Sequence, residues 1–236
     1  MSVGGRTGFG DGRAVAAETP PSKGVLRDYI ETIVVCVIFV IFSRAFVFQQ
    51  SKIPSGSMED TLLIGDYIMV NRFIYAPVSF DWERKLLPVR DVRRGDVVVF
   101  KFPAEPEIDY IKRIVGLPGD TVEVRDGYLY VNGKKATEPY VNPSYRHGES
   151  FGPITVEPDS YFAMGDHRDR SADSRVWGFV PQSLLKGRAL LVWWSYDEDS
   201  VEANPRGLVD SVKAVAGKAT HFLTRSRWSR CFTLIR

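Results

Sequence analysis

Two small hydroxyls on a loop are the first candidates for chemistry in this sequence. Ser55 and Ser57 flank Gly56 in the stretch Ile-Pro-Ser-Gly-Ser-Met, residues 53–58. Pro54 stiffens the stretch, because a proline fixes its own φ angle and disfavours a helical conformation in the residue before it. Such a loop can present an oxygen to a substrate. The same composition is typical of an ordinary surface turn, so the loop alone does not identify a site.

A lysine among apolar residues supplies a candidate base. Lys112 lies in Asp-Tyr-Ile-Lys-Arg-Ile-Val-Gly, residues 109–116, where β-branched and aromatic residues favour a strand. Burial of an ammonium group is costly and lowers its pKa. A serine is a poor nucleophile until a neighbouring base takes its proton, and a lysine can do so only when it is neutral. A serine of the first stretch and Lys112 therefore suggest a nucleophile and its base. Alternation along a strand predicts that Arg113 points to the opposite face.

A third stretch carries many charges of both signs. Residues 165–175 read Gly-Asp-His-Arg-Asp-Arg-Ser-Ala-Asp-Ser-Arg. Such a stretch can be a solvated turn with weak surface ion pairs. Apolar strand candidates on both sides, at 161–164 and 190–194, favour a loop packed against the core instead.

The composition excludes several classes of protein. With 236 residues and 44% hydrophobic content, the chain can form one large or two modest folded domains. The formal net charge of +2 gives no reason to expect nucleic acid as a partner. Cys36 and Cys231 lie far apart, and His147, His167 and His221 have no metal-ligand spacing. We therefore expect no disulfide framework, no metal site and no other cofactor.

A long apolar stretch near the start predicts a membrane anchor. Residues 29–48 are mainly apolar, with an uninterrupted centre at 33–42. About 20 such residues are enough for a helix to cross a bilayer, and Glu31 and Arg44 lie near enough to the ends to reach the headgroups. The apolar residues cover every face, which favours a membrane helix over a buried core helix.

A cleavable secretory signal is the other interpretation of this stretch, since Ser-Arg-Ala at 43–45 weakly imitates a cleavage site. The long preceding region and the apolar residues that follow favour an uncleaved anchor at 25–48, after a disordered tail at 1–24. The basic residues that precede the anchor outnumber Lys52 after it, which places the N-terminus in the cytoplasm. A short polar link at 49–52 would hold Ser57 close to the membrane. The preceding basic residues are Arg6, Arg13, Lys23 and Arg27.

The rest of the sequence predicts a mostly β fold: an antiparallel β-sheet or barrel-like catalytic domain at 49–120 and 161–200. Asp126-Gly127 is a strong hairpin signal, and Asn132-Gly133 offers a second turn. No helical patterns alternate with the strands, so a parallel α/β sheet is not expected. The expected strands are 66–70, 96–102, 110–115, 121–124, 128–131, 161–164 and 190–194.

Two further segments flank this predicted domain. Residues 121–160, rich in turns and prolines, are expected to form an inserted β-hairpin subdomain. Residues 201–236 form a basic C-terminal segment, which could lie on anionic lipid as an amphipathic element or extend as a solvated tail.

The ordered set of motifs resembles the bacterial type I signal peptidases, the membrane-bound leader peptidases with a Ser/Lys dyad. Each block is moderately specific, and their shared order between about residues 29 and 194 is highly specific. The blocks are the apolar anchor, Pro-Ser-Gly-Ser-Met at 54–58, Gly-Asp at 65–66, Arg-Gly-Asp-Val-Val-Val-Phe at 94–100, Tyr-Ile-Lys-Arg at 110–113, Gly-Leu-Pro-Gly-Asp at 116–120, and the stretches 165–175 and 177–181.

This resemblance implies a role for each polar candidate. Ser57 would be the nucleophile and Lys112 the general base. The Ser55 hydroxyl and the Ser57 backbone N–H would form the oxyanion hole. Ser171 would hydrogen-bond the lysine and orient it, while Asp173 and Arg175 would form a supporting ion pair. His167 and Arg170 stand where this family commonly has asparagine.

The resemblance also implies the substrate and the location. Secretory preproteins would be cut after a small-x-small motif, at the outer (periplasmic) face of the bacterial inner membrane, by a single-pass protein. Membrane lipid and, transiently, the secretion machinery would be further partners. Apolar side chains would line the substrate pockets: Ile53, Pro54, Met58, Leu62, Ile68 and Tyr110.

Three other functions could use parts of this sequence. A self-cleaving repressor of the LexA type would need a DNA-binding helix-turn-helix and an Ala-Gly cleavage site ahead of the serine, and neither is present. A Ser-His-Asp hydrolase could use His167 with Asp166 or Asp169, but no Gly-x-Ser-x-Gly elbow surrounds Ser55 or Ser57. The third alternative is a catalytically silent, membrane-anchored β domain that binds extended peptides by strand addition.

Overall fold

The computed structural model describes residues 25–42, 48–76, 89–147, 150–197, 211, 217 and 220–236. The chain divides into two units, one ending at Ile41 and one from Phe42 to Arg236. The predicted tail at 1–24 and the first part of the C-terminal segment lie outside the described residues.

Helix α1, Val25–Phe42, belongs to the first unit except for its last residue. Arg27 and Glu31 form an exposed ion pair one turn apart on this helix. Among the described residues, no helix is both long and apolar enough to cross a membrane. The predicted anchor over 25–48 is therefore not confirmed.

The start of strand β1, Phe48–Lys52, corrects two details of the sequence analysis. Phe48 begins a strand instead of ending a helix, and the residues expected to form a polar link are part of a sheet. The cause is backbone pairing: Phe48 lies opposite Asn71 and Lys52 opposite Tyr67 in an antiparallel ladder with β2. Their polar side chains do not indicate a strand, but pairing with β2 gives the backbone groups of these residues hydrogen-bond partners.

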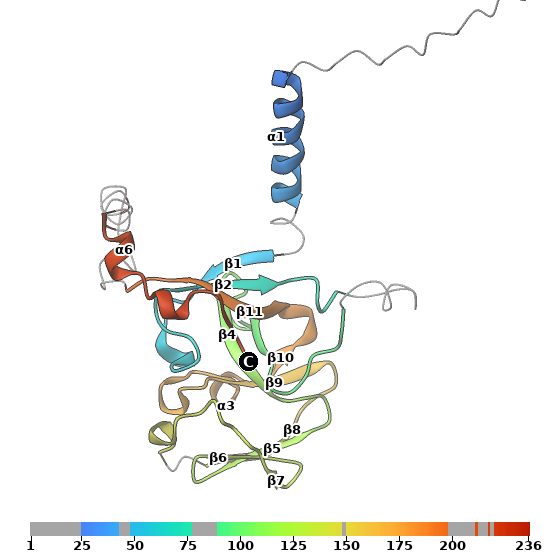
Figure 1. Cartoon of the computed structure of the whole chain (residues 1–236). Helices are drawn as coiled ribbons and strands as arrows, with labels where there is room; N and C mark the ends of the chain where they lie inside the picture. The colour runs from blue at the N-terminus through green and yellow to red at the C-terminus, as the bar shows by residue number, and fades with distance from the viewer. Residues whose placement is uncertain are drawn as a thin grey trace, which may run out of the picture. The chain divides into compact units, whose positions relative to one another are not determined.

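The larger sheet of the second unit has eight antiparallel strands (Figure 1). Their order is β1-β2-β11-β3-β4-β9-β10, with β12 paired to β11. Strand β2 alternates buried and half-buried residues, as expected when one face covers a core. The bounds are β1 Phe48–Lys52, β2 Asp66–Asn71, β3 Val97–Lys101, β4 Asp109–Gly116, β9 Ser160–Met164, β10 Val180–Pro181, β11 Leu185–Ser195 and β12 Thr233–Leu234.

A second sheet of four strands is built entirely from residues between Thr121 and Thr155, in the order β7-β6-β5-β8. Its tight turns, Asp126-Gly127 and Asn132-Gly133, have positive φ at all four residues, from 49° to 77°, which type I′ hairpins require. In Figure 1, β4 leads into this sheet and β8 leads back to β9. The bounds are β5 Thr121–Arg125, β6 Tyr128–Val131, β7 Lys134–Lys135 and β8 Phe151–Thr155.

Among the residues described in the second unit, the helical turns are short, and the prediction of a mostly antiparallel β fold is confirmed. These turns are η2 Gly56–Met58, η3 Pro143–Tyr145, η4 Arg168–Arg170, α3 Ser174–Trp177, η5 Gln182–Leu184, α6 Phe222–Arg225 and η6 Trp228–Arg230.

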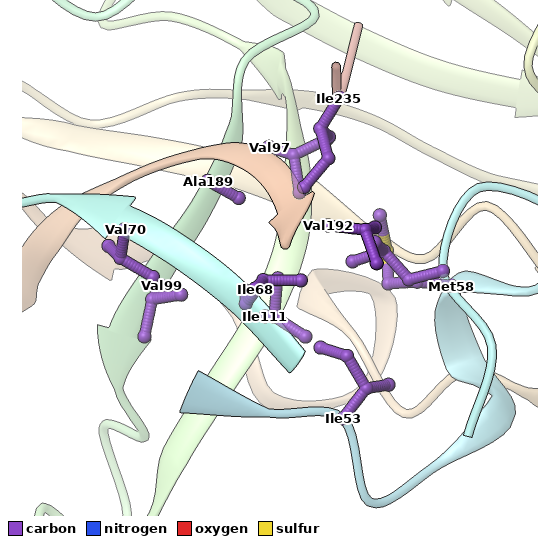
Figure 2. Packing of buried hydrophobic residues seen from close by; sticks show 11 residues of the cluster. Ile53, Met58, Ile68, Val70, Val97, Val99, Ile111, Ala189, Val192 and Ile235 are labelled. Carbon is purple, nitrogen blue, oxygen red and sulfur yellow. The ribbon is translucent and has the colours of Figure 1, made fainter. Parts of the chain in front are cut away.

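One buried cluster lies directly behind the loop that follows β1. It joins residues of that loop to side chains of β2, β3, β4 and β11 (Figure 2). Removing this much apolar surface from water is the main source of stability for such a sheet. The cluster consists of Ile53, Met58, Leu62, Ile68, Val70, Val97, Val99, Ile111, Ala189, Val192 and Ile235.

The end of the C-terminal segment belongs to the same fold. Strand β12 pairs with β11, and Ile235 is buried in the cluster of Figure 2. Arg230 donates to both carboxylate oxygens of Asp66, at 2.6 and 3.3 Å. For residues 226–236, a merely solvated tail is therefore wrong, because these contacts fix the segment on the sheet.

Candidate active site

The loop between β1 and β2 fixes the backbone around Ser57. Its two ends are joined by hydrogen bonds from Ile53 N to Asp66 O, at 2.9 Å, and from Gly65 N to Ile53 O, at 3.1 Å. Within the loop, turn η2 carries Ser57 at its centre, and the next side chain, Met58, is buried in the core. An apolar anchor next to the serine leaves its backbone little freedom to move.

Strand β4 brings the predicted base to this serine. Lys112 Nζ donates a hydrogen bond of 2.6 Å to Ser57 Oγ and one of 3.1 Å to Ile111 O. Lys112 is 4% exposed and Ser57 8% exposed. The two residues lie 55 positions apart in sequence, so the fold alone brings them together.

Burial changes the acid-base behaviour of Lys112. Desolvation disfavours the charged ammonium and lowers the pKa of Lys112 from 10.5 to about 8. The negative charges of Asp173 and Asp166 act in the opposite direction and are outweighed. About half of such amines are neutral at pH 8, so Lys112 can accept a proton under ordinary conditions.

The loop after β9 closes the site from a third side. His167 N donates to Ser57 O at 3.2 Å. A Cβ at Gly165 would lie 2.2 Å from Ser171 Oγ and 2.5 Å from Ser57 O, closer than real contacts allow. A glycine is therefore required where this loop passes the turn that carries the serine.

Ser171 lies beside the site without the predicted contact. Its hydroxyl is buried, and within the described ranges it has no hydrogen-bond partner. The expected bond between Ser171 and Lys112 is not formed in this structure, because Lys112 Nζ turns to Ser57 and Ile111 instead.

Replacing Gly165 with alanine should damage both stability and activity. The added methyl group would force Ser171 and the backbone of Ser57 apart, and overpacking of this kind costs on the order of 1–3 kcal/mol. We expect a lower melting temperature and a cleavage rate reduced by at least about tenfold, since a small displacement of a nucleophile is costly. Thermal unfolding and peptide cleavage measure the two effects.

A double variant separates these effects. In Gly165→Ala/Ser171→Gly, the added methyl group no longer clashes with the side chain of residue 171. It still lies 2.5 Å from Ser57 O. Stability should recover in part and activity should not. Wild-type values for the single Gly165→Ala variant would show that the loop is not tightly packed.

The predicted ion pair supports this loop. Arg175 Nε and Nη2 donate to Asp173 Oδ1 and Oδ2 at 2.8 and 2.9 Å. Asp173 also accepts a hydrogen bond of 3.0 Å from Gly165 N. The pair therefore acts on the site through the backbone of Gly165.

A second buried ion pair was missed in the sequence. Arg113 lies on the opposite face of β4 from Lys112, as alternation predicts, and donates to Asp166 at 2.8 and 2.7 Å. Arg113 is 1% and Asp166 0% exposed. Thr61 donates a further hydrogen bond of 2.5 Å to Asp166. Alternation along the strand predicts the face to which Arg113 points. No signal in the sequence indicates that its partner is Asp166, 53 positions away.

An open cavity of about 360 Å³ lies next to Ser57 and Lys112. Of the residues predicted to contact substrate, Pro54 and Tyr110 line it, and Ser55 lies in the same wall. Such a volume suits a short peptide segment better than a large folded ligand. The complete lining is Pro54, Ser55, Ser57, Ile108, Asp109, Tyr110, Ile111, Lys112, Arg170 and Ala172.

Four predicted pocket residues belong to the core instead. Ile53, Met58, Leu62 and Ile68 are at most 1% exposed and do not line the cavity. Figure 2 shows Ile53, Met58 and Ile68 packed among the strands. These side chains face the sheet interior and anchor the loop, and their contact with substrate stays a prediction.

The geometry also argues against a histidine-based hydrolase. The ring of His167 is stacked on Tyr145, with centroids 3.7 Å apart, and its Nε2 lies 3.8 Å from Glu59. Asp166 is bound by Arg113, and Asp169 contacts His147. Ser57 Oγ hydrogen-bonds Lys112, so the serine has a lysine partner and no histidine partner among the described residues.

Comparisons with known proteins give the family. Residues 26–194 match the family model of signal peptidase, peptidase S26. Signal peptidase I of Pseudomonas aeruginosa is 35% identical over 221 residues, 77% of each chain. A probable signal peptidase I-2 of Synechocystis sp. is 40% identical, over 75% of this chain and 77% of that protein. Signal peptidase I of Bacillus licheniformis is 34% identical, over 75% of this chain and 92% of that protein.

The family match covers the loop of Ser57, strand β4 and the loop after β9. The chain therefore belongs to the signal peptidase family, peptidase S26, whose serine peptidases remove signal peptides from proteins.

Proposed function

We propose that Ser57 is the nucleophile and Lys112 the general base of this peptidase. The neutral amine accepts the hydroxyl proton while Oγ bonds to the scissile carbonyl carbon. The proton then passes to the leaving amine as the C–N bond breaks, and water activated by Lys112 hydrolyses the ester. The observation that carries this proposal is the 2.6 Å contact between a buried amine and a hydroxyl at the edge of a cavity.

For the oxyanion hole we propose the hydroxyl of Ser55 and the backbone N–H of Ser57. Support comes from the position of Ser55 in the wall of the cavity and from its extended backbone, with φ at −137°. A donor of this kind typically contributes 10²–10³-fold to the rate, as a rough range. Lys112 would remain the proton carrier, with Asp173 and Arg175 as structural support and Ser171 as an orienting neighbour.

The proposed substrates are secretory preproteins cut after a small-x-small motif. Support comes from the family and from the modest cavity between Pro54 and Tyr110, whose walls would exclude large side chains. Transient contact with the secretion machinery is part of this proposal.

Signal peptidases I are membrane-associated in bacteria, and for this chain we propose a single-pass topology. The N-terminus would be cytoplasmic and the β domain would lie on the outer (periplasmic) face of the inner membrane, in contact with lipid. Support comes from the uncharged apolar run at 33–42 and the excess of basic residues before it. Protease accessibility in intact spheroplasts tests it: the β domain should be digested from outside, and protection of that domain would reverse the topology.

Cleavage of a preprotein by the detergent-solubilised full chain tests the reaction. We expect one cut directly after the small-x-small motif, and no cut when the small residue before the bond is replaced by tryptophan. A protein that binds the preprotein without cutting it would be the catalytically silent β domain instead.

The pH dependence of cleavage should follow Lys112. The protonated amine cannot act as a base, and its pKa is about 8, so kcat/KM should fall about tenfold per unit of pH below 8 and level off above. Initial rates from about pH 6 to 10 measure this, with circular dichroism at each pH to detect unfolding. A profile flat through pH 8 would contradict Lys112 as the base.

A further inference from the structure

Turn η4, Arg168–Arg170, carries three consecutive charges next to the cavity. Arg168 is buried and donates to Glu138 at 3.1 Å. Asp169 contacts His147. Arg170 is exposed, and no ion pair joins its side chain to any carboxylate in the part of the chain that the structure describes. Of the three, Arg170 is the one that lines the cavity beside Ser57 and Lys112.

The other charges in the cavity wall are already neutralised or buried. Asp109 is paired with Lys186 at 2.6 Å. Lys112 is buried and hydrogen-bonded to Ser57. Among the charged side chains that line the cavity in the described structure, Arg170 is thus the exposed one without an ion-pair partner.

The turn that bears Arg170 is held by its backbone. Arg170 N donates to His167 O at 3.2 Å, and Arg175 Nη2 donates to Arg168 O at 2.7 Å. A cation presented from a fixed turn loses less conformational freedom on binding than one on a free loop. A guanidinium also matches the two oxygens of a carboxylate in a bidentate contact.

We propose that Arg170 recognises an acidic side chain of the preprotein close to the scissile bond, and so gives this peptidase a preference for substrates with Asp or Glu at that position. This inference rests on the proposed function, since it requires a peptide in the cavity. An exposed ion pair changes affinity by a few-fold at most, so the preference should be about three- to fivefold and should weaken as salt is added.

A peptide panel tests this preference. Each peptide carries one small-x-small motif and a single Glu, Gln or Lys at one of the four positions on either side of the scissile bond. The full chain is assayed in a zwitterionic detergent, which removes anionic lipid. At one position at least, wild-type kcat/KM should favour Glu over Gln. Arg170→Gln should abolish this ratio, and Arg170→Glu should invert it in favour of Lys.

A matched control uses Arg93, an exposed arginine outside the cavity wall. Arg93→Gln makes the same change in charge and should leave the Glu/Gln ratio as in the wild type. If every peptide is cut by the wild type and Arg170→Gln changes no ratio, the inference is wrong while the proposed function stands. If the wild type cuts no peptide, both are wrong. If Arg170→Gln changes cleavage only when anionic lipid is added, Arg170 binds a lipid headgroup and the inference is overturned.

Discussion

Ser57→Ala and Lys112→Met should each lower preprotein cleavage by at least about 10³-fold, because each removes one half of the unit that activates the nucleophile. Alanine removes the oxygen that attacks the carbonyl. Methionine removes the amine that lies 2.6 Å from that oxygen while keeping an apolar chain of similar length. Purified full-length variants, assayed with a preprotein in detergent, give the rates.

Two further variants show whether the residues act as a unit. The double variant Ser57→Ala/Lys112→Met should be no slower than the slower single variant, because a base has no function without its nucleophile. Lys112→Arg keeps a positive charge but cannot give up its proton near neutral pH. It should be as inactive as Lys112→Met, which separates a base from a structural cation.

Folding controls make this prediction decisive. Lys101 is an exposed lysine on β3, and Lys101→Met should cleave like the wild type. Lys112→Met should melt at the wild-type temperature or above it, since it removes a buried amine that is costly to desolvate. Substantial cleavage by a folded Lys112→Met variant would show that Lys112 is not the base.

The fold could be predicted where alternation and turn chemistry were strong. Strand β6 was predicted with its observed bounds, and the predicted hairpin turn at Asp126-Gly127 is present, with positive φ at both residues. Strand β1 was missed because Gln-Gln-Ser-Lys is polar and resembles a link; only pairing with β2 makes it a strand. Strand β8 was missed for a similar reason, since Gly152 and Pro153 weaken the strand signal but are tolerated at the edge of the sheet.

The site, like the fold, could be predicted only in part. The cost of burying an amine pointed to Lys112 before any partner was known, and the structure places it against Ser57. The walls of the cavity could be predicted only in part, at Pro54 and Tyr110, because an apolar residue near a nucleophile can face either the substrate or the core. Met58 illustrates this ambiguity: it follows Ser57 directly and is completely buried.

Loss of Arg113 should cause the largest fall in stability. Its guanidinium meets the carboxylate of Asp166 where neither side chain is more than 1% exposed. Arg113→Met would leave that carboxylate buried without its cation, which typically costs about 3–5 kcal/mol. Arg113 Nη1 also donates to Gly95 O and Arg236 O, both at 2.8 Å, and those acceptors would lose their partner too.

An exposed pair provides the control. Arg94 and Asp120 are also 2.7 Å apart, but Arg94 is 43% exposed, so Arg94→Met should lower the free energy of unfolding by no more than about 1 kcal/mol. Denaturant unfolding of both variants compares the two sites under the same conditions. Equal losses in the free energy of unfolding would mean that burial does not increase the contribution of Arg113 to stability.

The double variant Arg113→Met/Asp166→Leu identifies the cause of the loss. If the cost of Arg113→Met comes from an uncompensated buried charge, removing the carboxylate as well should restore part of the stability, because apolar side chains can replace a buried ion pair at little cost. Activity should not return with it. Asp166 lies between Gly165 and His167, whose backbones contact Asp173 and Ser57, so the pair also sets the position of the loop that closes the site. A double variant less stable than Arg113→Met would show instead that packing and backbone hydrogen bonds, and not the charge, account for the loss.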